Sequence, residues 1–310
     1  MDVTEWLLDA DPSIRWQVMR DLTDTPAEVI AAQRARVATE GWGARLLSLQ
    51  GADGQWGGGT YSPKWISTTY TMLLLRLLGL DPESAGARAA IERVRDGVTW
   101  EGRGGKPFFG GDRETCVNGM VLVLGAYFRV TGELVDELLE WLLGQQLEDG
   151  GWNCRAPERS KRSSFNTTIL ALEALLEFER SNSAGPAVTA ARYRGEEYLL
   201  ERRLFRSLST GEVIRSEWTR FSFPPQWHYD VLRALDYLRS TGAAPDDRCG
   251  EAIELVRRRR GDDGRWLLQN THRARRHFAM EGADGTPSRW NTLRALRVLR
   301  WYEADGAARA

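Results

Sequence analysis

Three residues have side chains suited to acid–base chemistry: His228, Asp230 and Glu114. An imidazole titrates near neutral pH, so His228 could both donate and accept a proton. Asp230 or Glu114 could orient that imidazole or share its proton. The set predicts an acid–base catalytic centre. The alternative for His228 is structural, in which it caps its helix or fills a half-buried position.

Ten further residues are candidate substrate contacts, because they are aromatic, amide or thiol side chains near the expected starts of apolar helices. Aromatic rings can stabilise a cationic intermediate or bind an apolar chain. Core packing is the competing explanation for the rings, and the asparagines at 166 and 291 could be helix N-caps instead. The ten are Trp65, Tyr70, Cys116, Asn118, Phe165, Asn166, Trp227, Tyr229, Trp290 and Asn291.

These residues must be positioned by a repeated element, and the chain repeats one spacing of Gln, Gly and Trp. Q-x3-G-x-W occurs from Gln50 to Trp56 and from Gln146 to Trp152, and the stretch from Arg260 to Trp266 keeps the Gly and the Trp. Each copy follows an amphipathic stretch and precedes a loop that leads into an apolar stretch. A period of roughly 45 to 60 residues with two helices in each unit is typical of stacked helical hairpins.

The repeats alternate two kinds of expected helix. Amphipathic stretches cover residues 27–49, with an interruption near Gly41 and Gly43, and residues 84–95, 133–146, 187–203 and 247–260. More apolar stretches begin at Ser13 and cover 66–80, 115–130, 164–178, 226–239 and 288–302. An outer ring that faces water and an inner ring explain this difference. The pattern predicts an all-α fold, a single α/α toroid of about six helical hairpins, with an open solenoid as the alternative.

The expected organisation is one domain over residues 1–310. It comprises N-terminal helices over 1–45, repeats over 46–303 and a frayed tail over 304–310.

The repeat copies, with Asp-Gly before the Trp, resemble the repeats of the squalene cyclase and protein prenyltransferase superfamily from about Leu46 to Trp301. The resemblance implies an inner ring around an apolar cavity, with polar groups near the starts of the inner helices. It also implies that the repeat Gln and Trp are structural, and that the ligand is a lipophilic small molecule of the terpenoid or isoprenoid type.

The sequence departs from both branches of that superfamily. It lacks the DxDD acid of squalene cyclases. Glu114-x-Cys116 stands where prenyltransferases place a zinc-binding D-x-C pair, but the next apolar helix has no His. We therefore expect no metal and no cofactor. The acidic pairs Glu148-Asp149 and Asp262-Asp263 are expected to brace the repeat turns, and Asp246-Asp247 to cap a helix.

Composition and charge limit the partners and the cellular location that we expect. The formal net charge of -1 argues against a nucleic-acid partner. The N-terminus lacks the features of a signal peptide, no apolar run is long enough to span a membrane, and three scattered cysteines fit free thiols, so a cytoplasmic location is expected. Squalene cyclases use two helical domains, so a second helical domain or a homo-oligomer is a possible partner. A basic cluster could grip a diphosphate or remain solvated; it comprises His272, Arg273, Arg275, Arg276 and His277.

Three functions stay open from the sequence. The first is a terpene cyclase-like enzyme that carries out acid–base isomerisation, cyclisation or lyase chemistry. The second is a non-catalytic toroid that binds a ligand or a partner and has lost the superfamily's acids and metal. The third is a carbohydrate-active α/α toroid, whose paired carboxylates would come from Asp112, Glu114 and Asp230.

Overall fold

The computed structural model describes residues 2–101, 104–112, 114–156, 158–181 and 184–309. Ala310, the last residue of the expected tail, lies outside them. The chain divides into two compact units. The first unit comprises Met1–Arg36, Leu199–Arg273 and Phe278–Ala310, and the second comprises Val37–Tyr198 and Ala274–His277.

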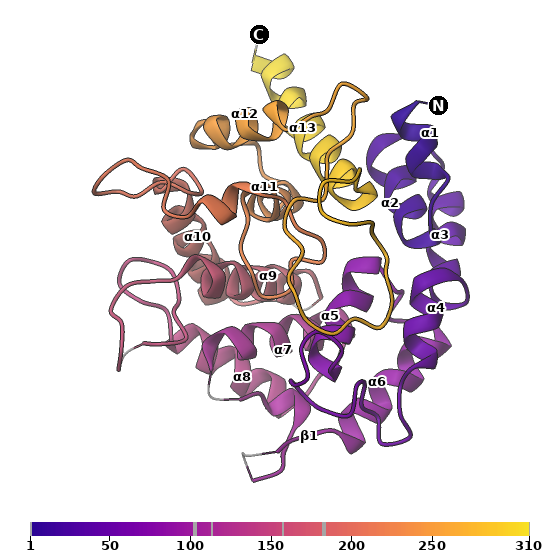
Figure 1. The fold of residues 1–310 in the computed structure, drawn as a ribbon. Helices are drawn as coiled ribbons and strands as arrows, with labels where there is room; N and C mark the ends of the chain where they lie inside the picture. The colour runs from indigo at the N-terminus through magenta and orange to yellow at the C-terminus, as the bar shows by residue number, and fades with distance from the viewer. Residues whose placement is uncertain (1, 102–103, 113, 157, 182–183, 310) are drawn as a thin grey trace. The chain divides into compact units, whose positions relative to one another are not determined.

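The second unit is built from alternating amphipathic and apolar helices. The apolar helices α5, α7 and α9 pack consecutively, and α7 and α9 lie side by side (Figure 1). Gly119 on α7 permits this approach, because a Cβ there would lie 3.1 Å from the carbonyl carbon of Leu170 on α9. The helices are α4 (Gly41–Ser48), α5 (Thr68–Leu78), α6 (Ala85–Gly97), α7 (Thr115–Tyr127), α8 (Glu133–Gly144), α9 (Phe165–Ser181) and most of α10 (Pro186–Glu201).

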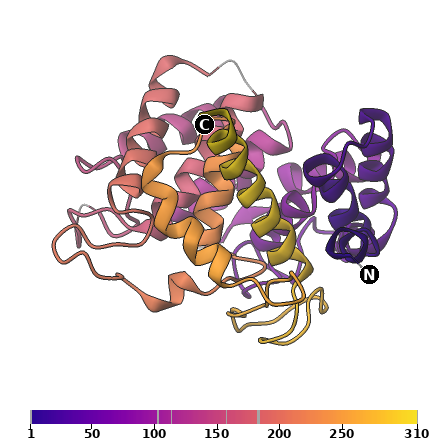
Figure 2. The ribbon, with the colours of Figure 1, turned by 90° about the horizontal axis from the view of Figure 1, so that it is seen from above.

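The first unit contains the two ends of the chain. Figure 2 shows the yellow helix α13 beside the orange helices α11 and α12, and α13 also packs on α2. Buried ion pairs join these elements, because the Asp236 carboxylate accepts hydrogen bonds from Arg297, which also pairs with Asp21 at 3.2 Å. The helices are α1 (Val3–Leu8), α2 (Pro12–Leu22), α3 (Ala27–Ala35), α11 (Val231–Ser240), α12 (Gly250–Arg258) and α13 (Arg289–Arg309).

The three repeat tryptophans make the same two hydrogen bonds. The indole Nε1 of Trp56, Trp152 and Trp266 donates to a carbonyl ten residues earlier, at 2.7, 2.8 and 2.8 Å. Their backbone N–H groups donate to a threonine hydroxyl on the following apolar helix. Because all three indoles are fully buried, each ties the end of one helix to the start of the next.

The repeat glutamines and glycines complete the same turn. The Gln50 amide donates to the repeat glycine carbonyl at 3.0 Å and to the Ala90 carbonyl at 2.9 Å. The Gln146 amide makes the equivalent bonds at 2.7 and 2.8 Å. Gly150 has a φ of 90°, and a Cβ there would lie 2.5 Å from the Arg194 carbonyl oxygen, so the turn requires glycine. These contacts are those of a structural repeat.

The all-α class is confirmed, and within the second unit each pair of helices has the alternation expected for an α/α toroid. The few other elements are the antiparallel hairpin β1 (Thr99–Trp100) and β2 (Lys106–Pro107) and the short 3-10 turns η1 (Arg36–Ala38), η2 (Phe108–Gly110), η3 (Ser216–Thr219) and η4 (Asp247–Cys249). Among the residues described, no helix has both the length and the apolarity needed to cross a membrane.

Two expected helix boundaries differ from the structure by five residues or more. The helix expected from residue 226 begins only at Val231, because Gln226 has a φ of 55°, outside the right-handed helical region, and Asp230 is the N-cap. Helix α13 continues to Arg309, through most of the stretch expected to be a frayed tail.

Candidate functional site

His228 lies in a stack of three rings in the first unit. Its imidazole is 3.7 Å from the Trp227 ring, centroid to centroid, with 22° between the planes. On the other side the His272 imidazole is also 3.7 Å away, at 11°. All three residues are half-buried, so the stack is partly open to a ligand or to solvent.

Two loops carry this stack, and backbone contacts hold the loops together. The Gln269 N–H donates to the Phe221 carbonyl at 3.0 Å, and the Phe221 N–H donates to the Gln269 amide oxygen at 3.1 Å. The Asn291 side chain donates to the carbonyls of Phe221 and Leu267, at 3.2 and 3.1 Å. The loop bearing His272 is closed by Asp284, which accepts a hydrogen bond from the Thr271 N–H at 3.0 Å.

The electrostatics favour a neutral His272. Burial lowers its pKa below the usual value near 6.5, the nearby Asp230 carboxylate opposes that shift, and the Arg233 charge reinforces it. Two imidazolium ions stacked face to face would also repel each other, so the pair takes up one proton more readily than two. The Trp227 ring face beside His228 can stabilise that single positive charge.

Asp230, predicted as a catalytic carboxylate, is the N-cap of α11. Its carboxylate accepts hydrogen bonds from the Arg233 N–H at 2.7 Å and from the Ser222 hydroxyl at 2.8 Å, and it is almost fully buried. Arg294 lies 3.9 Å away. The structure therefore shows that Asp230 caps the start of α11. The group that contacts the His228 imidazole face is the His272 imidazole and not a carboxylate.

The other predicted residues of this unit lie around the same loops in structural contacts. The Trp290 ring stacks on Phe223 at 4.3 Å, and the Tyr229 hydroxyl donates to the Leu204 carbonyl at 2.6 Å. Asn291 lies inside α13 and clasps the two loops, so the alternative that it caps the helix is wrong. Asn166 lies inside α9, and the same correction applies to it.

Sequence reasoning missed Glu281, a carboxylate in this unit. Burial raises its pKa above the usual value, and hydrogen bonds from the Trp290 N–H and the Ser288 hydroxyl, both at 2.9 Å, oppose the shift. It also missed His272 as a partner of His228. The available signal was that only three histidines occur in the chain, His228, His272 and His277.

A second group of predicted residues gathers in the second unit. The Trp65 ring meets the Tyr70 ring edge-on at 4.7 Å, and the Tyr61 ring lies 5.2 Å from that of Tyr70. Burial raises the pKa of Tyr61 to about 12, and burial together with the neighbouring Tyr61 also raises the pKa of Tyr70. Both phenols are therefore neutral at physiological pH.

Glu114 and Cys116 lie at the start of α7 beside these phenols. The Cys116 thiol donates to the Glu114 carboxylate at 3.7 Å. Interaction with Cys154, a residue that sequence reasoning did not single out, and burial raise the pKa of the Cys116 thiol. Glu114 belongs to the second unit, whereas His228 and Asp230 belong to the first.

The remaining predicted residues of the second unit have structural partners. The Asn118 amide group clamps the Asp112 backbone, accepting from its N–H at 2.7 Å and donating to its carbonyl at 2.9 Å. The Phe165 ring packs on Tyr198 at 5.4 Å. Asp149 accepts a hydrogen bond from the Ser163 N–H, which confirms the expectation that it braces a repeat turn.

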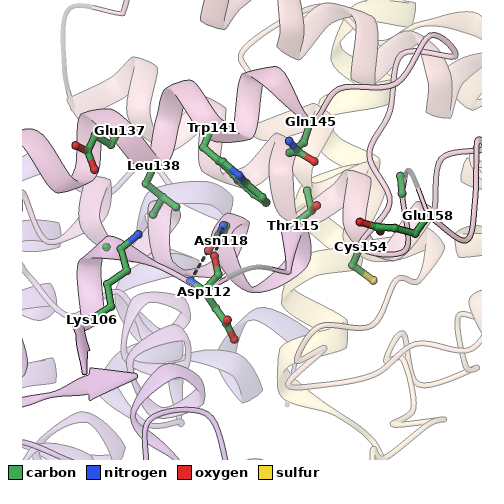
Figure 3. Close-up of a pocket in the computed structure, with 12 residues that line it drawn as sticks. Lys106, Asp112, Thr115, Asn118, Glu137, Leu138, Trp141, Gln145, Cys154 and Glu158 are labelled. Atoms are coloured by element: carbon green, nitrogen blue, oxygen red, sulfur yellow. Dashed lines mark hydrogen bonds between the residues drawn. The ribbon is translucent and has the colours of Figure 1, made fainter. Parts of the chain in front are cut away.

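A polar cavity of about 770 Å³ opens in the same unit (Figure 3). Figure 3 shows Lys106 and Glu137 toward one end and Cys154 and Glu158 toward the other. Charged and amide side chains dominate its wall, so it does not match the lipophilic cavity that the resemblance implies. The lining residues are Lys106, Gly110, Asp112, Thr115, Asn118, Glu137, Leu138, Trp141, Gln145, Cys154, Ala156 and Glu158.

The basic cluster is divided between the units. Arg273, Arg275 and Arg276 are exposed. The Arg275 backbone pairs with Lys64 and Trp65, at 3.2 and 3.1 Å, and so joins the second unit. The His277 ring is 2.9 Å from the Thr71 hydroxyl. That this basic cluster binds a diphosphate stays a prediction.

The chain matches no protein-family model and no curated protein. Among solved structures it is similar to a variant of the type II terpene cyclase MstE from Scytonema, determined without ligand. That structure is 14% identical, the match covers 99% of this chain and 86% of the other, and the TM-score is 0.41. What this chain binds or converts is therefore inferred from its own residues.

Proposed function

We propose that the protein is an acid–base enzyme that acts on a lipophilic, isoprenoid-like small molecule, with His228 and His272 as the groups that move the proton. The reaction is an isomerisation, a cyclisation or a lyase-type elimination, each of which transfers a proton to or from carbon. The observation that carries this proposal is the face-to-face contact of the two imidazoles beside the Trp227 ring.

The stack supports both halves of such a reaction. A singly protonated pair can donate a proton to an alkene, and a neutral pair can remove one from a carbocation. The desolvation that lowers the pKa of His272 keeps an imidazole base available at neutral pH. The half-buried Trp227 face offers an apolar, cation-stabilising surface next to the proton donor.

Asp230 supports the proposal indirectly. Its carboxylate is held by the N-terminus of α11, and its charge acts on His272 across the site, where it opposes the loss of the proton. Asp230 is therefore a positioning residue in this account.

The chain offers a matched control, because its third histidine, His277, contacts Thr71 instead of the stack. We would incubate the protein with geranylgeraniol and with squalene and analyse the products by gas chromatography and mass spectrometry. His228→Gln and His272→Gln are each expected to lower product formation by about 100-fold or more, the usual range for a lost acid–base group. His277→Gln is expected to leave it unchanged.

The second candidate is a non-catalytic binder, which is favoured by the structural use of Asp230. It predicts that native mass spectrometry detects bound isoprenoid without product, and that His228→Gln retains binding. Equal turnover by wild type and both stack variants would refute the catalytic proposal.

A further inference from the structure

The polar cavity of the second unit is lined by charged side chains that the acid–base proposal does not use. Its wall comes from three segments, which are α8, the stretch from β2 to the first turn of α7, and the loop after Trp152. Each of the described lining residues belongs to the second unit. At about 770 Å³ the cavity has the size of pockets that hold small molecules. It therefore has room for a ligand of its own.

One face of α8 forms the long wall of the cavity. Glu137, Trp141 and Gln145 follow one another at intervals of four residues, so their side chains lie on the same face. With a helical rise of 1.5 Å per residue, Glu137 and Gln145 are about 12 Å apart along the axis. Trp141 is only half-buried, and Figure 3 shows its ring pointing into the cavity. The cavity is therefore elongated, with an aromatic ring midway along it.

Lys106 places a positive charge at one end of the cavity. It pairs with Trp100 in the β1–β2 hairpin, and the Trp100 indole donates to the Phe108 carbonyl at 2.8 Å. The Lys106 stem passes over Gly110, where a Cβ would lie 2.7 Å from the Lys106 Cε. Figure 3 shows the ammonium group directed into the cavity from the end where Glu137 lies.

Glu158 places a negative charge at the opposite end. Asn153 holds the loop that carries it, because its amide donates to the Arg162 carbonyl at 2.6 Å and accepts from the Arg155 N–H at 2.9 Å. Figure 3 shows the Glu158 carboxylate directed toward Thr115. The two ends of the cavity therefore carry opposite charges.

The groups that face the cavity are available to a ligand. Within the part of the chain that the structure describes, no hydrogen bond or ion pair joins the side chains of Lys106, Trp141, Gln145 or Glu158 to another residue. The unit pairs its buried charges, as Arg76 does with Glu177 at 2.9 Å. Opposite charges at the two ends favour a ligand whose own charges are arranged in the complementary order.

We propose that this cavity binds a short peptide of about three residues with free ends, its carboxylate at Lys106 and its ammonium at Glu158. An extended chain spans about 3.3–3.6 Å per residue, so three residues fit a length of about 12 Å. The Gln145 amide hydrogen-bonds to the peptide backbone, and the Trp141 ring packs on the middle side chain. Asp112 and Glu137 add negative charge to the wall, so a cationic middle residue is preferred.

The test is isothermal titration calorimetry of the intact protein at low ionic strength, where ion pairs are least screened. The probes are trialanine, its C-terminal amide and its N-acetyl form. Wild type should bind trialanine, and each cap should weaken binding by about 2–5-fold, the range for an exposed ion pair. In Lys106→Gln the amide and the free acid should bind equally, and in Glu158→Gln the N-acetyl form and the free amine should bind equally.

Two exposed residues of the same unit that do not line the cavity give matched controls. Lys161→Gln and Glu140→Gln should retain the full effect of both caps. In wild type, Ala-Lys-Ala should bind about 2–5-fold more tightly than Ala-Glu-Ala. The proposal is overturned if wild type does not bind trialanine, if the effects of the caps persist unchanged in Lys106→Gln and Glu158→Gln, or if spermidine or maltotriose binds more tightly than trialanine.

Discussion

Asp236 is the residue whose replacement should test the packing of the first unit most sharply. Its carboxylate accepts a hydrogen bond from the Arg297 Nε at 2.7 Å and contacts Arg239 at 3.1 Å and Arg294 at 3.7 Å. All four side chains are no more than 20% exposed. Burial alone would raise the pKa of Asp236, but the charges of these arginines lower it overall.

Asp236→Asn keeps the shape and removes the negative charge. Three buried guanidinium groups then lose their common partner, and breaking a buried ion pair from one side costs about 3–5 kcal/mol. Because Asn can retain part of the hydrogen bonding, we take about 3 kcal/mol. At about 2.1 cal/mol/K of unfolding entropy per residue, this lowers the Tm of a 310-residue chain by about 4–5 °C.

The assay is thermal unfolding followed by circular dichroism, with Asp96→Asn as the control. Asp96 pairs with Arg95 at 2.7 Å on an exposed face, where an ion pair contributes little. A carboxyl with a lowered pKa stabilises above its unfolded pKa and loses that contribution as the pH falls, so D236N should also flatten the loss of stability in acid. If D236N melted no earlier than D96N, the network would not contribute as argued.

Three further predictions follow from the fold. Gly150→Ala should lower the free energy of unfolding by more than about 1 kcal/mol, because φ is 90° and the Cβ would meet the Arg194 carbonyl; Gly144→Ala, which meets nothing, should be neutral or stabilising in the same urea titration. Gln146→Ala should cost about 1–2 kcal/mol by removing hydrogen bonds at 2.7 and 2.8 Å, and equal stability to wild type would contradict this. Because the pKa of His272 is lowered, its contribution to the free energy of unfolding is present above about pH 6.5 and is lost as the pH falls through its pKa in the folded state. His272→Phe keeps the ring stack and should lose less stability than wild type between pH 7 and pH 5. An unchanged dependence of stability on pH would refute the lowered pKa of His272.

The sequence predicted the helices well because the repeat residues act locally. Trp152 hydrogen-bonds to a carbonyl ten residues earlier, and Gln146 to the carbonyl of the repeat glycine. The Q-x3-G-x-W spacing itself therefore specifies these contacts. Apolar stretches such as 115–130 and amphipathic stretches such as 133–146 became α7 and α8 with boundaries close to those expected. The helix expected from residue 226 begins later than predicted, because the left-handed φ of Gln226 and the cap at Asp230 override the apolar periodicity.

The site was harder to predict because its contacts are long-range. Nothing in the spacing of His228 and His272 shows that a reciprocal pair of hydrogen bonds between Phe221 and Gln269 will join their loops. The interaction between Cys116 and Cys154 likewise joins residues that lie far apart in the sequence. Asp230 was assigned to catalysis on its nearness to His228 in sequence, whereas its N-cap position decides its contacts.

The most direct test of the acid–base proposal is turnover of geranylgeraniol and squalene in deuterium oxide. A proton moved by His228 and His272 exchanges with solvent, so we expect product with carbon-bound deuterium from wild type and from His277→Gln. The label should be strongly reduced in His228→Gln and His272→Gln. Isoprenoid that is bound, as detected by native mass spectrometry, but recovered unchanged and unlabelled would contradict catalysis by the histidine pair.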